Sequence, residues 1–491
     1  MADNKKQYAT SFEVKQMSLY TVDNEFEPYA RLDGDMCKQF QYFEDIFWPS
    51  YAATMVVQDS SENLISAMPI QGFEKCIVEI DDLEGGNYSY EFRVWNISNR
   101  VETGRNQVYT LGLLSVEGML NEGITVNKII EGNTSNQVKK ILTDYFRVPD
   151  GKIDTENSST SIKILPTKRS PFALIRSILP KTISEKVSPV LKKFNIETTI
   201  KGGEIVGDIP QFTSDVRITG TQGKGSAGYF FFQTRRGYVF RSIDSLISTD
   251  TDNFNGDPTI NNTDKYKNEK FRWQTAKVGE PSTMLIQEII FGKELDMIKK
   301  MREGHYSNIC CFFNINTHSY EEQVYSLKDT WEQMAHLGDP NKELPPGQVT
   351  LSKYPSRTMS TVINNEVWYS GKDVASDDPK EGGDSKSTHP YQDFQKHYLQ
   401  QGLSRAGILF NQQLTISLTG HLELCAGDKI EIELPNPKKE SEKDSDVDPI
   451  YSGTYLIKNL NHQFNMTDDR SVYTVLDLIR DSNGIRDNLK K

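Results

Sequence analysis

One short stretch of the sequence carries residue types that could bind a metal ion. His421, Glu423 and Cys425 alternate in HLELC, and alternate residues of a strand share one face, so the three side chains could hold one ion. A strand with a buried cysteine explains the same spacing, and we favour that interpretation. The seven histidines show neither HExxH nor a pair at zinc spacing, so we predict no metal site.

Two loops approach the patterns of phosphate and calcium sites. In GTQGKGS (220–226), Lys224 is followed by Gly225 and then by an aromatic strand, whereas a phosphate loop needs Ser or Thr and a helix. In DTDNFNGD (250–257), Phe254 occupies a ligand position and no glutamate closes the loop. We interpret these stretches as a flexible arm and a solvated turn, and we predict no cofactor.

Catalytic chemistry has no positive support in the sequence. There is no G-x-S-x-G elbow. A glycosidase needs two placed carboxylates, and among 68 acidic residues nothing singles out a pair. We therefore predict no catalytic residues.

Composition narrows the class of protein. A net charge of −12 argues against binding nucleic acid through phosphate contacts. At 491 residues the chain suggests about three to four domains. No apolar run is long enough to span a bilayer, and the N-terminus shows no signal-peptide pattern. The five cysteines form no CxxC pair, as expected of reduced thiols in a cytosol; they are Cys37, Cys76, Cys310, Cys311 and Cys425.

The elements that must position these residues follow from periodicity. Apolar residues at helical spacing predict helices in TSNQVKKILTDYF and SPFALIRSIL, with Thr134 or Ser135 capping the first and Pro171 at the first position of the second. A helix in FGKELDMIKKMREG is expected to end on Gly304. Two aromatic strands that meet near Arg235 to Gly237 predict a hairpin.

Two parts of the chain, far apart in sequence, share one order of strands. The first runs KCIVEI, YEFRVWNI and VYTLGLLS, and the second runs DKIEIEL, GTYLIKNLNHQF and VYTVLDLI. The second is longer by about the length of KKESEKDSDVD, an insertion that a loop accommodates at small entropic cost. Antiparallel meanders also resemble one another by chance, but we favour an internal duplication.

The predicted fold class is α+β and rich in β structure, with two similar tube-like β-barrel domains and mixed α/β middle domains. The expected boundaries are 1–125 for the first barrel, 126–250 for a mixed domain with an inserted loop at 201–227, 251–345 for a second mixed domain, and 346–491 for the second barrel. Flexible loops are expected at 370–390 and 435–449, where charge, Gly, Pro and Ser accumulate.

The C-terminal stretches QGLSRAGILFNQQLTISL, SGTYLIKNLNHQF and SVYTVLDLIRDSNG resemble the end of the central baseplate hub protein of contractile-tailed bacteriophages. The shared features are a Gly-Asp step, a SGTYLI strand, a His-bearing strand and a closing Arg-Asp; here they are Gly427, Asp428, Ser452–Ile457, His462, Arg480 and Asp481. SPFALIRSIL and GYFFFQTRRGYVFRSIDSL resemble the middle of the same family. The resemblance extends to the hub portion of type VI secretion spikes.

This resemblance implies a structural protein of the virion, located in the tail baseplate and assembled in the host cytoplasm. It implies a homotrimer whose two barrels per chain make a six-position ring between the tail tube, or a tube-initiator protein, and the central puncturing spike. DNA and the tape measure would pass through an acidic lumen without specific binding, and no membrane anchoring is implied. We predict that the ring interface lies on the strands around Ile77, Val78, Val94, Val108, Ile430, Ile432, Leu456 and Val472.

Two alternatives stay open from the sequence. One is a virion-associated peptidoglycan hydrolase, which would clear peptidoglycan in a zymogram. The other is a peripheral baseplate or receptor-binding protein, which would lack a trimer with a central hole.

Overall fold

The computed structural model describes the chain in separate ranges. They are 11–32, 36–60, 70–82, 86–104, 106–185, 217–218, 227–247, 270–273, 284–292, 296–315, 318–331, 334–337, 344–363, 367–369, 395–436, 447–467 and 470–482. The loop expected at 370–390 lies outside these ranges, as do GTQGKGS, DTDNFNGD, most of 201–227 and much of 435–449.

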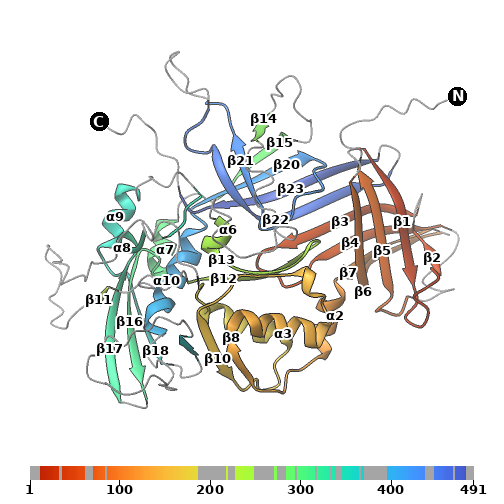
Figure 1. The fold of residues 1–491 in the computed structure, drawn as a ribbon. Coiled ribbons are helices and arrows are strands. Elements are labelled where there is room, and N and C mark those ends of the chain that lie inside the picture. The colour runs from red at the N-terminus through yellow and green to blue at the C-terminus, as the bar shows by residue number, and fades with distance from the viewer. Residues whose placement is uncertain are drawn as a thin grey trace.

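A 13-stranded sheet runs through both ends of the chain (Figure 1). Its N-terminal strands are β1 (Phe12–Tyr20), β2 (Ala30–Arg31), β3 (Cys37–Asp45), β4 (Ala52–Asp59), β5 (Lys75–Asp82), β6 (Asn87–Thr103) and β7 (Asn106–Leu114). Its remaining strands are β14 (Lys270–Trp273), β15 (Leu285–Phe291), β20 (Gln412–Thr419), β21 (Lys429–Glu433), β22 (Gly453–Asn465) and β23 (Ser471–Arg480).

The C-terminal strands close into a six-stranded barrel, because β22 is hydrogen-bonded to β23 as well as to β21. Alternate residues of β4 and β20 are buried, as expected for strands with one face on a core. One continuous apolar cluster fills the interior of both strand groups. Its fully buried members include Phe40, Phe92, Ile416 and Phe464.

The two strand groups have the same internal order. It is β1-β5-β6-β7-β4-β3 in the N-terminal group and β14-β21-β22-β23-β20-β15 in the barrel. One direction differs, because β1 runs antiparallel to β5 whereas β14 runs parallel to β21. The predicted class, a multidomain and β-rich α+β fold, is confirmed. Of the two predicted barrels, the C-terminal one is closed, whereas among the described residues no pairing joins β1 to β3 to close the N-terminal group.

The strand pairing changes one expected assignment. β14 and β15 come from 251–345, which we expected to form a mixed domain, yet they pair with β21 and β20 of the C-terminal barrel. Sequence order could not show this, because the pairing joins segments that lie far apart along the chain. The other domain boundaries stay a prediction.

The middle of the chain forms smaller mixed layers below and to the left of the large sheet in Figure 1. Its first part contains α2 (Val116–Gly123), β8 (Ile130–Asn133), α3 (Thr134–Phe146), η1 (Asp150–Lys152), β9 (Ile153–Thr155), β10 (Thr160–Ile164), α4 (Pro171–Ile178), η2 (Leu179–Lys181), β12 (Tyr229–Thr234), β13 (Gly237–Ser242) and α6 (Ile243–Ile247). Its second part contains β11 (Arg217–Ile218), α7 (Met297–Glu303), β16 (Ser307–Asn314), β17 (Ser319–Ser326), α8 (Leu327–Trp331), α9 (Pro346–Ser352), β18 (Arg357–Val362), β19 (Val367–Tyr369) and α10 (Gln395–Ile408).

Local sequence signals account for most of these helices and for the hairpin. α4 begins with Pro171 at its first position, and α7 ends on Gly304 in the left-handed conformation, φ 77°. The cap of α3 differs from the prediction. Asn133 caps it by accepting from Ser135 N at 3.1 Å, while the Thr134 hydroxyl bonds the Ser158 hydroxyl at 2.6 Å.

Candidate assembly interface

Strand β22 joins the two strand groups, because its edges serve three partners. One edge pairs with β23 from Leu456 to Asn465. The other edge is divided: its first part, from Gly453 to Leu456, pairs with β21, and its second part, from Asn459 to Asn465, pairs with β3. Edge-to-edge pairing of this kind turns two sheets into one and leaves fewer exposed backbone groups.

Aromatic side chains pack across the β3–β22 ladder. The ring centroids of Phe40 and Phe464 lie 5.6 Å apart, and Phe12 of β1 meets Phe464 edge-on at 5.1 Å. Tyr42 stacks on His462 at 6.1 Å. Burial lowers the pKa of His462 to about 3, so this imidazole is neutral and shares a hydrogen bond with the Thr474 hydroxyl at 2.9 Å.

A buried carboxylate fastens three segments at this junction. Glu44, on the core side of β3, accepts at one oxygen from the Tyr42 hydroxyl at 2.7 Å and from Arg235 N at 2.6 Å. Its other oxygen accepts from Ala426 N at 2.7 Å. Burial raises the pKa of Glu44, although these hydrogen bonds act in the opposite direction. Both carboxylate oxygens of Glu44 accept hydrogen bonds, so the role of this side chain is to hold these segments together.

The turn of the β12–β13 hairpin places two arginines between the strand groups. The guanidinium of Arg235 lies 4.8 Å above the Tyr88 ring of β6. Arg236 forms a bidentate pair with Asp428, with both N–O distances 2.8 Å, and donates to Glu423 O at 2.7 Å. One arginine therefore contacts the N-terminal group and the next contacts the barrel.

A second buried ionic cluster anchors the end of β23. Arg405 of α10 donates to Asp481 at 2.9 Å and to Asp244 of α6 at 2.8 Å. His336 lies 2.7 Å from Asp481 and 2.8 Å from the Trp331 carbonyl. Burial would raise the pKa of Asp481, but His336 and Arg405 lower it well below its usual range. The cluster holds the barrel on the middle layers.

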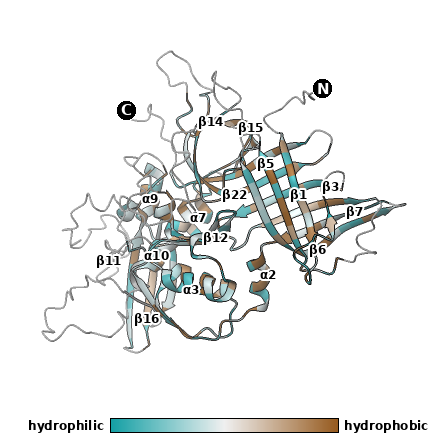
Figure 2. Ribbon diagram, turned by 45° about the vertical axis from the view of Figure 1, so that its right-hand side comes forward, coloured by the Kyte–Doolittle hydropathy of each residue, from teal (hydrophilic) through white to brown (hydrophobic). Residues whose placement is uncertain are grey.

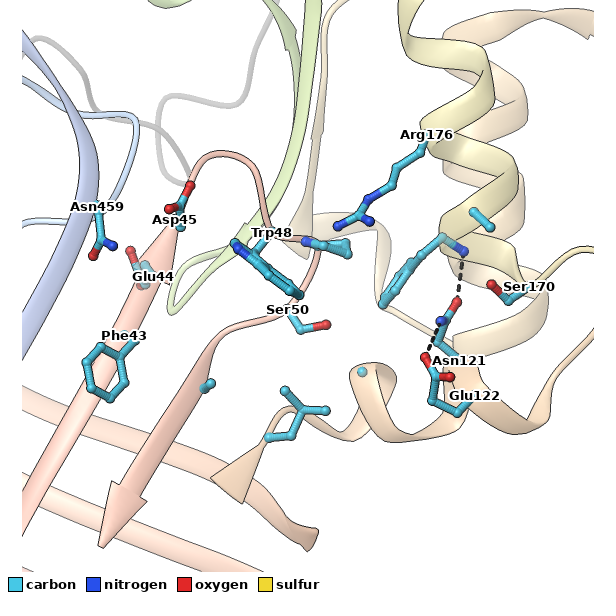
Figure 3. Close-up of a pocket in the computed structure, with 16 residues that line it drawn as sticks. Phe43, Glu44, Asp45, Trp48, Ser50, Asn121, Glu122, Ser170, Arg176 and Asn459 are labelled. Atoms are coloured by element: carbon cyan, nitrogen blue, oxygen red, sulfur yellow. Dashed lines mark hydrogen bonds between the residues drawn. The ribbon is translucent and has the colours of Figure 1, made fainter. Parts of the chain in front are cut away.

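A cavity of about 700 Å³ lies beside the junction. Figure 3 shows Trp48 between Glu44 and Asp45 of β3 on one side and Arg176 of α4 on the other. Arg176 lies 5.7 Å above the Trp48 ring, and Asn121 and Glu122 of α2 share a hydrogen bond of 3.1 Å. These two contacts are local, and the residues that line the cavity show no evident acid–base pair.

The predicted ring-interface residues fall into two sets. Six side chains are buried in the core of this chain and so cannot contact another subunit; they are Val78, Val94, Ile430, Ile432, Leu456 and Val472. Ile77 is partly exposed and Val108 is 37% exposed. Strand alternation explains the division, because neighbouring residues such as Ile77 and Val78 point to opposite faces of the sheet. The interface itself stays a prediction.

The motif residues have structural roles. Gly427 adopts φ 86°, and a Cβ there would lie 2.6 Å from the Phe232 ring. Asp428 holds Arg236, and Arg480 lies 5.4 Å above the Tyr455 ring and donates to Ser452 O at 3.0 Å. Sequence reasoning missed Glu44, Asp244 and Arg405. Of these three residues, only Glu44 could have been identified from the sequence, because it is a charged residue on the inward face of the strand FQYFED.

His421, Glu423 and Cys425 do not lie on a strand, contrary to our expectation, but in the turns before β21. Burial raises the pKa of the Cys425 thiol to about 12, which disfavours a thiolate ligand. Within the described ranges, no cluster of three or more His, Cys, Asp or Glu is placed to hold a metal ion. No helix in the described part of the chain has the length and apolarity to cross a membrane.

Comparisons with known proteins found similarity only among solved structures: no family model matches the chain, and no curated protein matches it. A tail protein from Neisseria meningitidis MC58 is 11% identical, with a TM-score of 0.46, and the match covers 95% of this chain and 96% of that one. The 43 kDa tail protein of prophage MuSo2 from Shewanella oneidensis is 8% identical, with a TM-score of 0.47 and coverage of 96% and 99%. An E. coli component of the type VI secretion system is 8% identical, with a TM-score of 0.40 and coverage of 97% and 79%.

Proposed function

We propose that this protein is the structural hub of a phage tail baseplate, a homotrimer that forms a pseudo-six-fold ring between the tail tube and the central puncturing spike. The observation that carries the proposal is the β3–β22 ladder, which joins two strand groups of equivalent order within one chain. A chain with two near-equivalent units fills two positions of a ring, so three chains fill six. A three-fold spike can then meet a six-fold tube.

The polar face of the junction supports a channel that does not hold DNA. Along the ladder beyond the cavity, the outward side chains include the amides Asn461 and Gln463 on β22 and Gln39 and Gln41 on β3. Uncharged amides offer the phosphates of DNA no attractive charge. We propose that this face lines the lumen, through which DNA and the tape measure pass.

The mass and shape of the purified protein test the proposal. A hub gives particles of three 55.9 kDa chains with a central hole in electron micrographs. A protein that stays monomeric at high concentration and is absent from the tail axis of the particle would contradict it. A zymogram separates the hydrolase alternative, because a hub gives no clearing of peptidoglycan.

A further inference from the structure

Strands β6 and β22 correspond in their pairing, although β6 has a second register shift, between Ser98 and Val101, that β22 lacks. Each has a bulge at the same place, between Val94 and Asn96 in β6 and between Ile457 and Asn459 in β22. The backbone bonds before the bulge also match. Val94 O accepts from Phe73 N at 2.7 Å, and Ile457 O accepts from Gly427 N at 2.9 Å. These matches make Asn96 the counterpart of Asn459.

Strands β3 and β15 are equivalent by the same criteria. Each pairs antiparallel with the corresponding strand of its group, β4 or β20. Each carries a bulge in its first half, between Cys37 and Gln39 in β3 and between Ile286 and Glu288 in β15. Ile290 is therefore the counterpart of Gln41.

The equivalent edges differ in what covers them. The second part of β22 is covered by β3, but β5 covers β6 only as far as Arg93. Among the described residues, no strand pairs with the same edge of β6 from Asn96 to Thr103. Likewise β14 pairs with β15 only at Leu285 and Ile286, and no described strand covers that edge from Glu288 to Phe291.

We propose that β15 of one copy pairs antiparallel with β6 of the next copy, and so repeats between chains the β3–β22 ladder found within the chain. The pairing rests on the proposed ring. Within the chain, Gln41 of β3 lies opposite Gln463 of β22, and Gln463 pairs with Tyr473 of β23. The equivalent row of the N-terminal group pairs Val101 of β6 with Val108 of β7, because β6 has a second register shift between Ser98 and Val101. Ile290 of one copy therefore lies opposite Val101 of the next.

The exposure of these side chains supports the register. Val101 is 60% exposed and Ile290 is 56% exposed, and both lie on the outward face. Val108, opposite Val101 on β7, extends the same apolar surface. Figure 2 shows β6 and β7 reaching outward on the right of the molecule. Apolar cross-strand pairs stabilise a ladder, and unpaired strand edges are templates for a second chain.

A disulfide tests the register directly. In an antiparallel ladder, opposite residues have Cα atoms about 4.5–5.5 Å apart, within disulfide reach. The Val101→Cys, Ile290→Cys double variant is oxidised and run without reductant, and the bond is identified by peptide mass spectrometry. We expect covalent oligomers that stop at the ring size. The Val101→Cys, Glu288→Cys variant, displaced along β15 to about 7–8 Å, and each single variant are the controls and should link at least about tenfold less.

Charge variants provide a second measurement. Val101→Lys or Ile290→Lys should each shift the protein to monomers at equal concentration, and Val101→Lys combined with Ile290→Glu should restore the oligomer. A ring that persists in both lysine variants, together with no disulfide between positions 101 and 290 in the double variant, overturns the ladder but leaves the hub. A native protein that forms no oligomer and no link overturns both.

Discussion

The two strand groups follow one plan, and they differ mainly at their edges. β3 covers the second part of one edge of β22, whereas the matching part of β6 has no strand partner among the described residues. A second difference lies at the following strand ends. Asp481, after β23, enters a buried ionic cluster, whereas Ser115, after β7, caps α2. A duplicated fold thus keeps its ladders while its ends acquire different anchors.

Removing these two anchors, one at a time, should give the largest difference in the free energy of unfolding. Arg405→Ala leaves Asp244 and Asp481 buried without this partner, so we expect a loss of about 3–5 kcal/mol in the free energy of unfolding. Ser115→Ala removes one helix cap and should cost about 1 kcal/mol. Urea denaturation of both variants measures the difference. Equal losses would contradict the assigned roles.

The matched pair Leu460 and Ile97 tests the covered and uncovered edges. Leu460 is fully buried on β22, so Leu460→Ala should cost about 2–5 kcal/mol. Ile97, its counterpart on β6, is only partly buried, so Ile97→Ala should cost about 1 kcal/mol or less in the monomer. Denaturation at protein concentrations too low for the chains to associate measures the loss of unfolding free energy in both variants. A similar cost at both sites would show that the β6 edge is already packed.

The buried His462 gives the barrel a pH dependence. The unfolded chain binds a proton at this residue below about pH 6.5, and the folded chain does so only near pH 3. The unfolded state therefore binds more protons between these values, so stability falls as the pH drops. From pH 7 to pH 5 we expect a loss of about 2 kcal/mol from this residue. His462→Gln should flatten that slope, whatever its cost at pH 7.

The smallest expected difference in stability concerns two residues in the left-handed backbone conformation, one before β5 and one before β21. Gly427→Ala introduces a Cβ that meets the Phe232 ring at 2.6 Å, and we expect a cost of about 1–3 kcal/mol. Phe73, its counterpart, already adopts φ 75° and packs under Arg93. Phe73→Gly relieves the backbone and loses that contact, so stability should stay within about 1 kcal/mol of the native value. Thermal melts compare the two.

The local elements and the repeated order of strands could be predicted from the amino-acid sequence. Alternation along KCIVEI and helical spacing in TSNQVKKILTDYF suffice for this, because those signals act between neighbours in the chain. Three features became apparent only in the folded chain: β14 and β15 complete the C-terminal barrel, β3 covers half of one edge of β22, and Glu44 and Arg405 are buried and paired. Such contacts join segments far apart in the chain, and no local pattern specifies which strand edge or which opposite charge a segment will meet.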